Sequence, residues 1–424
     1  GGREQLPSAT PPFADHGGSP GAAESAETMQ ERDLMDARAF AGGVPHDYFR
    51  HLRDRPGLTR AHDAEGYPFW YLVRHADVVR ASRDHDTFRS GPSTMTSVRQ
   101  DSTGLPLISF LDAPEHTRLR KLAFKGFTPA RLAALDKPVA AIVDRILDDC
   151  ADAGAFDLAE DLAMQLPLEV LTELIGVPPD ERAQVVEWTR HTVNLGDPDY
   201  HHSTPEKAVA AFGNLMAYFE ELLGRRRAAP ADDLFSVLLA AGNDTSGRLE
   251  PREIALFATT LMGAGSETTY CSVTGGVLAL LDHPGQLAAL RADRTLIPLA
   301  VEEIIRWVTP ATHFARQVAR DTEIAGQPVR AGERVVLWYT SANRDESAFD
   351  RPERFDVGRQ PNPHISFGGG GPHVCIGRGL ATLELRLLLA ALIDRLPRLE
   401  LTGTPVRSIT NFMNSFRHMP ARFT

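Results

Sequence analysis

Three absences limit the class of protein to which this sequence can belong. It has only three cysteines, Cys150, Cys271 and Cys375, which are far apart and odd in number. Such spacing provides no disulfide framework and favours a reducing compartment, so we expect a cytoplasmic protein. The longest apolar runs, such as residues 275–281, are much shorter than the roughly 20 residues of a membrane-spanning helix. The N-terminus also lacks an apolar secretory core, and we expect no membrane span.

An excess of positive charge is lacking as well. The chain has 45 basic and 56 acidic residues, a net charge of −11, whereas bulk nucleic-acid binding needs a strong basic surface. Its 42% hydrophobic and 24% charged residues are typical of a globular protein. We predict a mobile tail over residues 1–32, where Gly, Pro, Ala and Ser are frequent, and a single domain over residues 33–424.

The stretch from His364 to Ala381 contains the least ordinary pattern. Four glycines, residues 368–371, precede Cys375, and apolar residues recurring at helical spacing from Leu380 predict a helix directly after the cysteine. A helix N-terminus favours an anion and lowers the pKa of a thiol. From the residues alone, a buried core cysteine and a thiolate ligand of haem iron both remain open. A phosphate loop would need Gly-Lys-Ser or Gly-Lys-Thr, and a zinc site would need further Cys or His at short spacing.

The longest helical pattern runs from Pro251 to Asp282 and would span roughly 45 Å at about 1.5 Å per residue. Its middle holds Gly263 and Gly265 beside serine and threonine, which predicts a distorted turn because hydroxyls can bond back to helix carbonyls. Glu267 and Thr268 place an acid beside an alcohol there. Taken alone, this pair also fits an exposed Glu next to a helical Thr.

Weaker patterns accompany these two stretches. His116 and Arg120 share one face of a basic helix predicted over residues 114–127, and Glu303 and Arg306 stand three apart on another helix. Further helices are predicted over 46–53, 75–83, 129–150, 160–175, 179–193 and 205–227. Strands are predicted over 58–60, 69–73, 312–319 and 327–337, with a C-terminal hairpin over 409–423.

Together these motifs resemble the cytochromes P450. The family's haem-binding signature reads Phe, a glycine-rich turn, His, any residue, Cys, any residue, Gly, then Leu-Ala. In this chain the loop before the cysteine is one residue longer than the commonest form, which leaves open which residue takes the usual ring contact. The run from Ala342 to Glu346 and the extended loop look like actinobacterial members that act on sterols, methyl-branched lipids and terpenoids. The matching residues are Phe367, Gly368, His373, Cys375, Gly377, Leu380 and Ala381.

The resemblance implies a mainly α fold with small β-sheets, the triangular prism of the family, with haem b between the long central helix and the cysteine helix. Cys375 would be the axial ligand of the iron, Glu267 the proton source and Thr268 the hydrogen-bonding group for dioxygen. Glu303, Arg306 and Arg354 would form a buried network, with Arg359 as the alternative third member. The other implied cofactor contacts are His116, Arg120, Ala264, Gly265, Arg316, His364, Phe367, Gly368, His373, Gly377 and Ala381.

The implied reaction is monooxygenation with O2, in a monomer that receives electrons from NAD(P)H through a separate ferredoxin and ferredoxin reductase. A basic face around Lys121 and Lys125 would suit the acidic partner. Alternatives are a peroxide-driven or non-hydroxylating tailoring enzyme, or a haem-based gas-binding protein. We expect a small hydrophobic substrate, either a sterol, branched lipid, terpenoid or polyketide. The residues predicted to line its pocket are Met95, Val98, Leu261, Thr312, Phe314, Phe412 and Met413.

Overall fold

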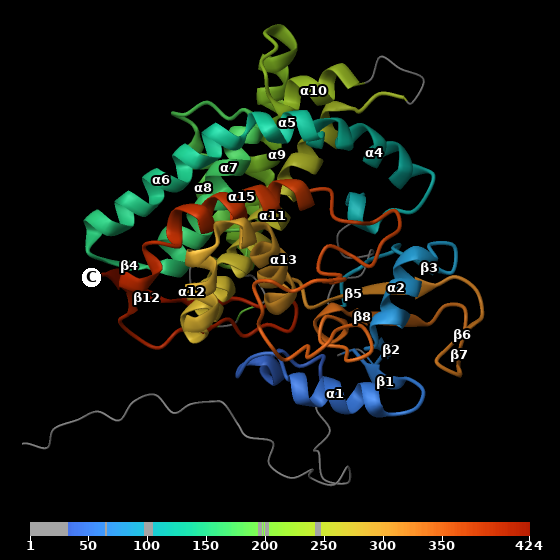
Figure 1. The fold of residues 1–424 in the computed structure, drawn as a ribbon. Helices are drawn as coiled ribbons and strands as arrows, with labels where there is room; N and C mark the ends of the chain where they lie inside the picture. Colours follow the sequence, from blue (N-terminus) through green and yellow to red (C-terminus); the bar gives the residue numbers. More distant parts are fainter. Residues whose placement is uncertain are drawn as a thin grey trace, which may run out of the picture. The chain divides into compact units, whose positions relative to one another are not determined.

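Most of the chain is helical, and the helices surround one central helix, α11 (Pro251–Asp282) (Figure 1). The structure is a computed structural model that describes residues 33–63, 66–96, 105–193, 197, 199, 203–241 and 247–424. The predicted tail over residues 1–32 lies outside the described residues. Residues 33–424 group as one compact unit, and their treatment as a single catalytic domain stays a prediction.

Helix α11 begins and ends where the sequence pattern predicts, with Pro251 in its first turn and a capping box between Glu250 and Glu253. It packs against α7, α9, α13 and α15. Gly275 and Gly276 permit the contact with α13, because a Cβ at either position would lie 2.7 Å from a side-chain carbon of that helix. The helix α11 is not interrupted at Gly263 and Gly265, and the distorted turn expected there stays a prediction. Its hydroxyls do bond back to carbonyls, as Thr268 Oγ1 does to Ala264 O at 2.9 Å.

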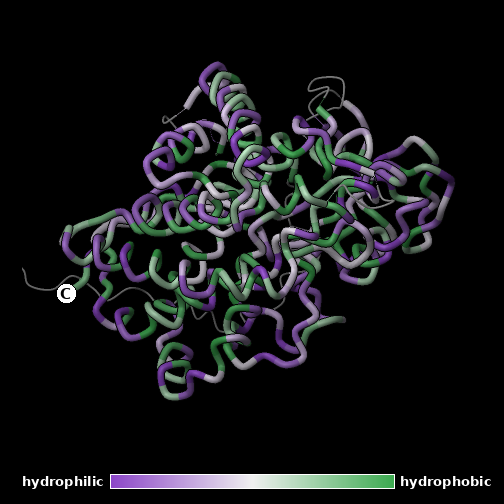
Figure 2. Tube along the Cα trace, turned by 90° about the horizontal axis from the view of Figure 1, so that it is seen from above, coloured by the Kyte–Doolittle hydropathy of each residue, from purple (hydrophilic) through white to green (hydrophobic). Residues whose placement is uncertain are grey.

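Most of the remaining helices pack apolar side chains in one large core, whereas those of α1, α2 and α14 belong to two smaller clusters. Hydrophobic and hydrophilic segments alternate along them (Figure 2), and none of the described helices is long and apolar enough to cross a membrane. The basic helix predicted over residues 114–127 is shorter, because its last four residues turn as a 3₁₀ helix. The helices are α1 (His46–Asp54), α2 (His75–Arg83), α4 (Glu115–Ala123), α5 (Pro129–Ala134), α6 (Asp136–Ala153), α7 (Gln165–Ile175), α8 (Arg182–Arg190), α9 (Pro205–Ala228), α10 (Leu234–Ala240), α12 (Pro284–Ala292), α13 (Ile297–Val308), α14 (Tyr339–Ala342) and α15 (Arg378–Leu392).

A mixed five-stranded sheet has the order β1-β2-β8-β5-β3. Strands β2 and β8 are parallel, and the other neighbours are antiparallel. In β5, alternate side chains face one side, which places Phe314 and Arg316 together. The strand predicted over 327–337 is two strands, because the chain turns between them. The strands of this sheet and the β6–β7 hairpin are β1 (Thr59–His62), β2 (Pro68–Leu72), β3 (Phe88–Arg89), β5 (His313–Val318), β6 (Thr322–Ile324), β7 (Gln327–Val329) and β8 (Arg334–Trp338).

The C-terminal segment differs from the predicted hairpin. Its two strands join different sheets, β11 pairing with β10 and β12 lying between β4 and β9. The residues before β11 run along the start of β5 instead, where Thr312 N donates to Phe412 O at 2.8 Å. These strands are β4 (Ala155–Asp157), β9 (Leu399–Leu401), β10 (Val406–Arg407), β11 (Phe416–His418) and β12 (Pro420–Phe423).

Candidate active site

A cavity of about 290 Å³ lies where α11, α15, β5 and the glycine-rich loop meet. Cys375 is at one wall and Thr268 of α11 is at another. The cysteine side chain keeps accessible surface because it faces this cavity, although protein surrounds it. Most of the residues that the sequence predicts for the site line this one space. They are His116, Arg120, Leu261, Ala264, Gly265, Thr268, Phe314, Arg316, Phe367, Gly368, His373, Cys375, Gly377 and Ala381.

The glycine-rich loop is held against helix α2 on its outer side. Gly371 has a φ of +79°, and a Cβ there would lie 2.4 Å from the carbonyl oxygen of Ser82. Glycine is therefore needed for close packing and for a left-handed backbone. On the inner side, Cys375 N donates to Phe367 O at 2.9 Å, which fixes the cysteine at the cavity wall.

The surroundings of the Cys375 sulfur act in two directions. Burial raises the pKa of the thiol. The backbone N–H groups of Gly377 and Arg378 at the start of α15, and the guanidinium of Arg120, oppose this rise because they favour a thiolate. The net effect is a raised pKa, and the helix N-terminus supplies donors that would stabilise the thiolate once the sulfur binds a metal ion.

Four cationic or imidazole side chains line the same cavity: His116, Arg120, Arg316 and His373. The rings of His116 and His373 stack with centroids 3.9 Å apart. Burial, with a contribution from Arg120, lowers the pKa of His116 to about 4. Burial also lowers the pKa of Arg316. In the described part of the chain, none of the four forms an ion pair with a carboxylate.

The two buried guanidiniums are suited to an anionic ligand, because burial of an uncompensated charge is costly, and the two neutral imidazoles can each donate one hydrogen bond to it. The two propionates of a b-type haem supply two carboxylates, and Arg binds a carboxylate with a planar fork. A sulfur donor, two guanidiniums and two imidazoles therefore line one cavity. The residues present fit haem b, whose holders would be Cys375, His116, Arg120, Arg316 and His373.

The two members of the predicted acid–alcohol pair, Glu267 and Thr268, lie in different environments. Thr268 lines the cavity, whereas Glu267 is half-buried and, among the described residues, does not belong to the lining. Its carboxylate contributes to the raised pKa of Cys271, after the larger effect of burial. The catalytic roles of Glu267 and Thr268 stay predictions.

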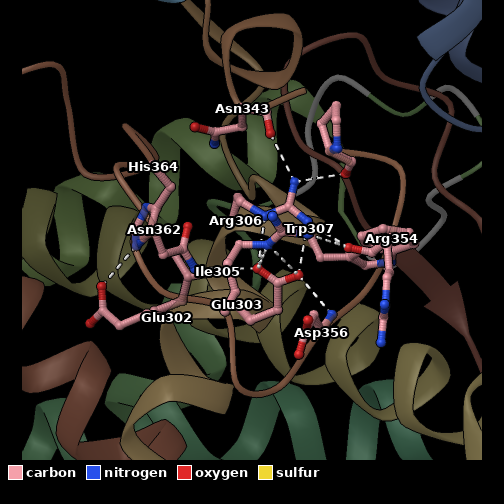
Figure 3. A network of polar contacts seen from close by, with 12 residues as sticks. Glu302, Glu303, Ile305, Arg306, Trp307, Asn343, Arg354, Asp356, Asn362 and His364 are labelled. Carbon is pink, nitrogen blue, oxygen red and sulfur yellow. Dashed lines mark hydrogen bonds and ion pairs between the residues drawn. The ribbon is translucent and has the colours of Figure 1, made fainter. Parts of the chain in front are cut away.

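Behind the cavity, Glu303 of α13 forms the predicted buried network (Figure 3). Arg306 donates from Nε and Nη2 to the two carboxylate oxygens of Glu303, each at 2.8 Å, and both side chains are fully buried. The third guanidinium is that of Arg359, whose Nε lies 3.1 Å from Glu303 Oε2. The prediction of Arg354 is wrong, because its side chain is exposed and it contributes its carbonyl oxygen to Arg306 and Arg359.

Asn343 connects this network to the cysteine loop, a role that the sequence motifs did not indicate. Its Nδ2 donates to Thr309 and to Ser366, and its Oδ1 accepts from Ile365 N at 2.8 Å. Thr309 ends α13 with a φ of +46°, a strained conformation for a β-branched residue, and it leads directly into the cavity wall at Pro310. A buried amide thus fixes both the wall and the loop.

Several predicted residues do not reach the cavity. His364 is wrong as an anion-binding residue of the cavity, since its Nε2 lies 2.8 Å from Glu302 Oε2 of α13 (Figure 3). Of the predicted substrate contacts, Thr312 donates to Asn411 O, and Phe412 packs edge-on against Phe314, one layer behind the wall. Met413 forms a bridge with Ala311. Met95 accepts a hydrogen bond at its carbonyl from Arg334, and Val98 lies outside the described residues.

Comparison with known proteins agrees with this geometry. A family model, cytochrome P450, matches residues 199–422. The chain is 35% identical over 401 residues to the steroid C26-monooxygenase of Rhodococcus jostii (strain RHA1), covering 91% of this chain and 83% of that protein. It is 33% identical over 403 residues to the linalool 8-monooxygenase of Pseudomonas putida, covering 92% and 98%. A solved structure, Mycobacterium marinum cytochrome P450 CYP268A2 in complex with pseudoionone, matches with a TM-score of 0.84 and 34% identity, covering 93% and 100%. Because these likenesses extend over nearly the whole chain, the protein belongs to the cytochrome P450 family and is a haem-dependent monooxygenase.

Proposed function

We propose that this monooxygenase oxidises a hydrophobic isoprenoid-type molecule, a sterol or a terpenoid, with branched lipids and polyketides as the wider class. One observation carries the proposal: the cavity that presents Cys375 and Thr268 also has walls made of apolar side chains. Leu171, Leu261, Ile305, Ala311 and Phe314 face it. Apolar walls bind apolar surface without requiring hydrogen bonds, at roughly 25 cal/mol for each Å² removed from water.

The names of two relatives support the same substrate class. Steroid and linalool are both hydrophobic isoprenoid-type molecules, and the solved neighbour carries pseudoionone. The relatives differ widely in substrate size. The class is therefore part of the proposal, and a particular substrate is not.

When bound, the haem would supply O2 activation at its iron, which the Cys375 sulfur would hold. The side chains that would hold its carboxylates are His116, Arg120, Arg316 and His373. Thr268 lines the cavity, while Glu267, the residue before it in α11, supplies protons from the protein side. The apolar walls position the substrate and keep bulk water away from the reacting atoms.

Electrons come from NAD(P)H through a separate ferredoxin and reductase. Lys121 belongs to α4, the helix that also carries His116 and Arg120, and Lys125 belongs to η3 (Phe124–Phe127) directly after it. Phe124 between the two lysines is half exposed. Cations around an exposed aromatic side chain suit an acidic protein partner. Charge reversal at both lysines is expected to slow electron transfer and to change its salt dependence.

The function is tested by spectroscopy and by turnover. The reduced wild-type protein is expected to form a CO complex with the shifted Soret band of a thiolate ligand, and Cys375→His is expected to lose this shift. Sterols, terpenoids, branched fatty acids and macrolide polyketides are then titrated for a low-to-high-spin change. Absence of a change with sterols and terpenoids would exclude the proposed class. Product formation with peroxide alone, and none with O2, NAD(P)H and a ferredoxin system, would favour the peroxide-driven alternative.

A further inference from the structure

A second, smaller cavity of about 60 Å³ lies between α4 and the first half of α11, next to the main cavity. Ile108 of the 3₁₀ helix η2 (Ile108–Phe110) lines both cavities, so one side chain separates them at this point. Among the described residues, the lining of the smaller cavity is apolar except for Glu115, Glu253 and Thr260. The proposed mechanism does not use this space.

Helix α11 connects the two cavities along one of its faces. Leu256 and Thr260 line the smaller cavity, and Ala264 and Thr268 line the main one. These residues stand four apart in the sequence, and side chains at that spacing lie on one face of a helix. Along the helix axis, Thr260 is therefore about 12 Å from Thr268. The smaller cavity thus continues the wall that carries Thr268.

The polar groups of the smaller cavity already have partners within the protein. The hydroxyl of Thr260 donates to Leu256 O at 2.8 Å. The carboxylates of Glu115 and Glu253 both accept from the guanidinium of Arg118, which links α4 to α11 beside the cavity. A buried water needs about two to four polar partners, and an apolar cavity stays dry. The lining is therefore suited to an apolar guest.

The volume of the smaller cavity limits the size of this guest. A cavity of roughly 150 Å³ binds one benzene ring, whereas one water needs roughly 10–15 Å³. At about 60 Å³, the smaller cavity excludes the ring system of a sterol but accepts a diatomic gas. A monooxygenase consumes one such apolar molecule, O2, which has to reach the main cavity while the organic substrate fills it.

We propose that the cavity between α4 and α11 is a holding site for O2, which passes Ile108 to reach the Thr268 wall of the main cavity. An apolar space beside the main cavity raises the local amount of an apolar gas, because the gas leaves water to enter it. No bond forms or breaks in this step. The inference goes beyond the proposed function, since it concerns the gas and not the organic substrate.

The first experiment identifies the kind of guest. Crystals of the haem-loaded protein are placed under xenon pressure, since xenon is an apolar atom that binds dry cavities. We expect a xenon peak in the smaller cavity of the wild-type protein. The peak should be lost in Leu119→Phe, which places a larger apolar side chain in the cavity from α4. An ordered water in place of xenon, or no xenon there in the wild-type protein, would overturn the inference.

Leu278→Phe is the matched control for Leu119→Phe. Leu278 is also a partly buried leucine packed against the large core, and it lies on α11. Among the described residues, it lines neither cavity. The same enlargement at this position should therefore keep the xenon peak.

The second experiment measures delivery of gas to the iron. Flash photolysis of the reduced CO complex and stopped-flow mixing with O2 give the association rate constants of both gases without any organic substrate. Leu119→Phe and Thr260→Leu fill the smaller cavity from opposite walls. Each should lower both constants by about two- to tenfold, where tenfold corresponds to about 1.4 kcal/mol in the barrier. Ile108→Ala should raise them, because it thins the partition between the cavities.

Either filling variant provides the test if the other does not fold. Constants equal to those of Leu278→Phe would show that the smaller cavity has no part in gas delivery. The inference and the proposed function fail in different measurements. A wrong substrate class appears in the spin-state titrations of the wild-type protein. A wrong role for the smaller cavity appears as unchanged gas association in variants whose CO complex keeps the thiolate shift.

Discussion

Two groups of polar side chains, one around Glu303 and one along the cavity, differ in whether each charged group has a partner of opposite charge. Around Glu303, the carboxylate accepts from the guanidiniums of Arg306 and Arg359, from the amide of Asn362 and from the backbone of Asp356. Along the cavity, by contrast, Arg316 donates to the carbonyl of its own neighbour, and His116 stacks on His373 without a carboxylate partner among the described residues.

This difference indicates that the Glu303 network has a structural role and that the cavity cluster has a ligand-binding role. A buried ion pair with every donor and acceptor satisfied holds its surroundings in one arrangement, whereas buried cations without anions mark a place for a ligand. If this distinction is correct, removing a charge should have opposite effects on the haem-free protein in the two regions. The predictions below test this, starting with the largest effect.

In the satisfied network, Arg306→Ala is expected to destabilise the protein by about 3–5 kcal/mol, because it leaves Glu303 buried without its main partner. Arg359→Ala should act in the same direction. Both variants should give little soluble, haem-containing protein, since the network supports the segment that leads into the cysteine loop. Urea denaturation and the ratio of haem to protein measure the two effects.

Arg354→Ala is the matched control for this network. It removes the same kind of side chain a few residues away, but that side chain is exposed and the network uses only its backbone carbonyl. We expect its unfolding free energy to stay within about 0.5 kcal/mol of wild type. Equal losses in Arg354→Ala and Arg306→Ala would contradict the assignment of Arg359 as the third member.

In the unsatisfied cluster, Arg316→Met is expected to leave the haem-free protein as stable as wild type or more stable, because it removes a buried charge that lacks an anion. The haem-loaded protein should lose haem roughly 10- to 100-fold faster, since a hydrogen bond to a charged group contributes about 1.5–3 kcal/mol. Urea denaturation of the haem-free form and transfer of haem to an acceptor apoprotein measure the two quantities.

Arg334→Met on the neighbouring strand β8 serves as the control for Arg316. Arg334 pairs in register with Gln317 and, among the described residues, is not part of the cavity lining. Its replacement should leave the rate of haem loss unchanged. The comparison between the two regions would be broken if Arg316→Met destabilised the haem-free protein as strongly as Arg306→Ala.

The sequence predicts those parts of the site that depend on fixed local spacing. The cysteine loop and the His116–Arg120 helix reach the cavity because their side chains follow the local backbone. The long central helix has its predicted bounds, since Pro251 starts it and a capping box fixes its first turn. The third arginine was misassigned because it depends on the turns of residues 351–359, where Arg351 adopts a φ of +44°. Spacing alone does not reveal which of several arginines in such a segment turns inward.

Glu384 and His364 show a second limit of the sequence. His364 precedes the loop by only a few residues, yet its side chain faces Glu302 on α13 and does not line the cavity. Glu384, a buried residue that lines the cavity, stands four residues after Leu380 on the apolar stripe of its helix, and a charged residue on such a stripe is a signal that the sequence did contain. Whether that residue finds a partner depends on tertiary packing, which the pattern does not give.

The buried imidazole of His313 in β5, which bonds to neutral partners, provides the smallest test of the same distinction. His313 is buried, and its two ring nitrogens lie 3.1 Å from the hydroxyl of Thr96 and 2.9 Å from that of Thr312. Burial lowers the pKa of His313 from 6.5 to about 3, with the backbone at Asn411 opposing. This imidazole is therefore satisfied as a neutral group and has no place for a proton.

The contribution of His313 to the unfolding free energy depends on pH because the folded and unfolded states bind its proton at different pH values. Above pH 6.5, the folded and unfolded states are both neutral at His313, and the group contributes nothing. As the pH falls below 6.5, the unfolded state binds a proton that the folded state does not bind until about pH 3, so stability is lost. By pH 5.5 the loss is about 1.4 kcal/mol for one such group. Between pH 7.5 and 5.5, wild type should therefore lose about that much more unfolding free energy than His313→Gln, whose amide can still bond to both hydroxyls. Urea denaturation of both proteins at the two pH values measures this difference. The contributions of the histidines that the two proteins share cancel in the comparison. Equal losses would mean that His313 accepts a proton when folded, and that burial without an anion does not by itself exclude a charge from this protein.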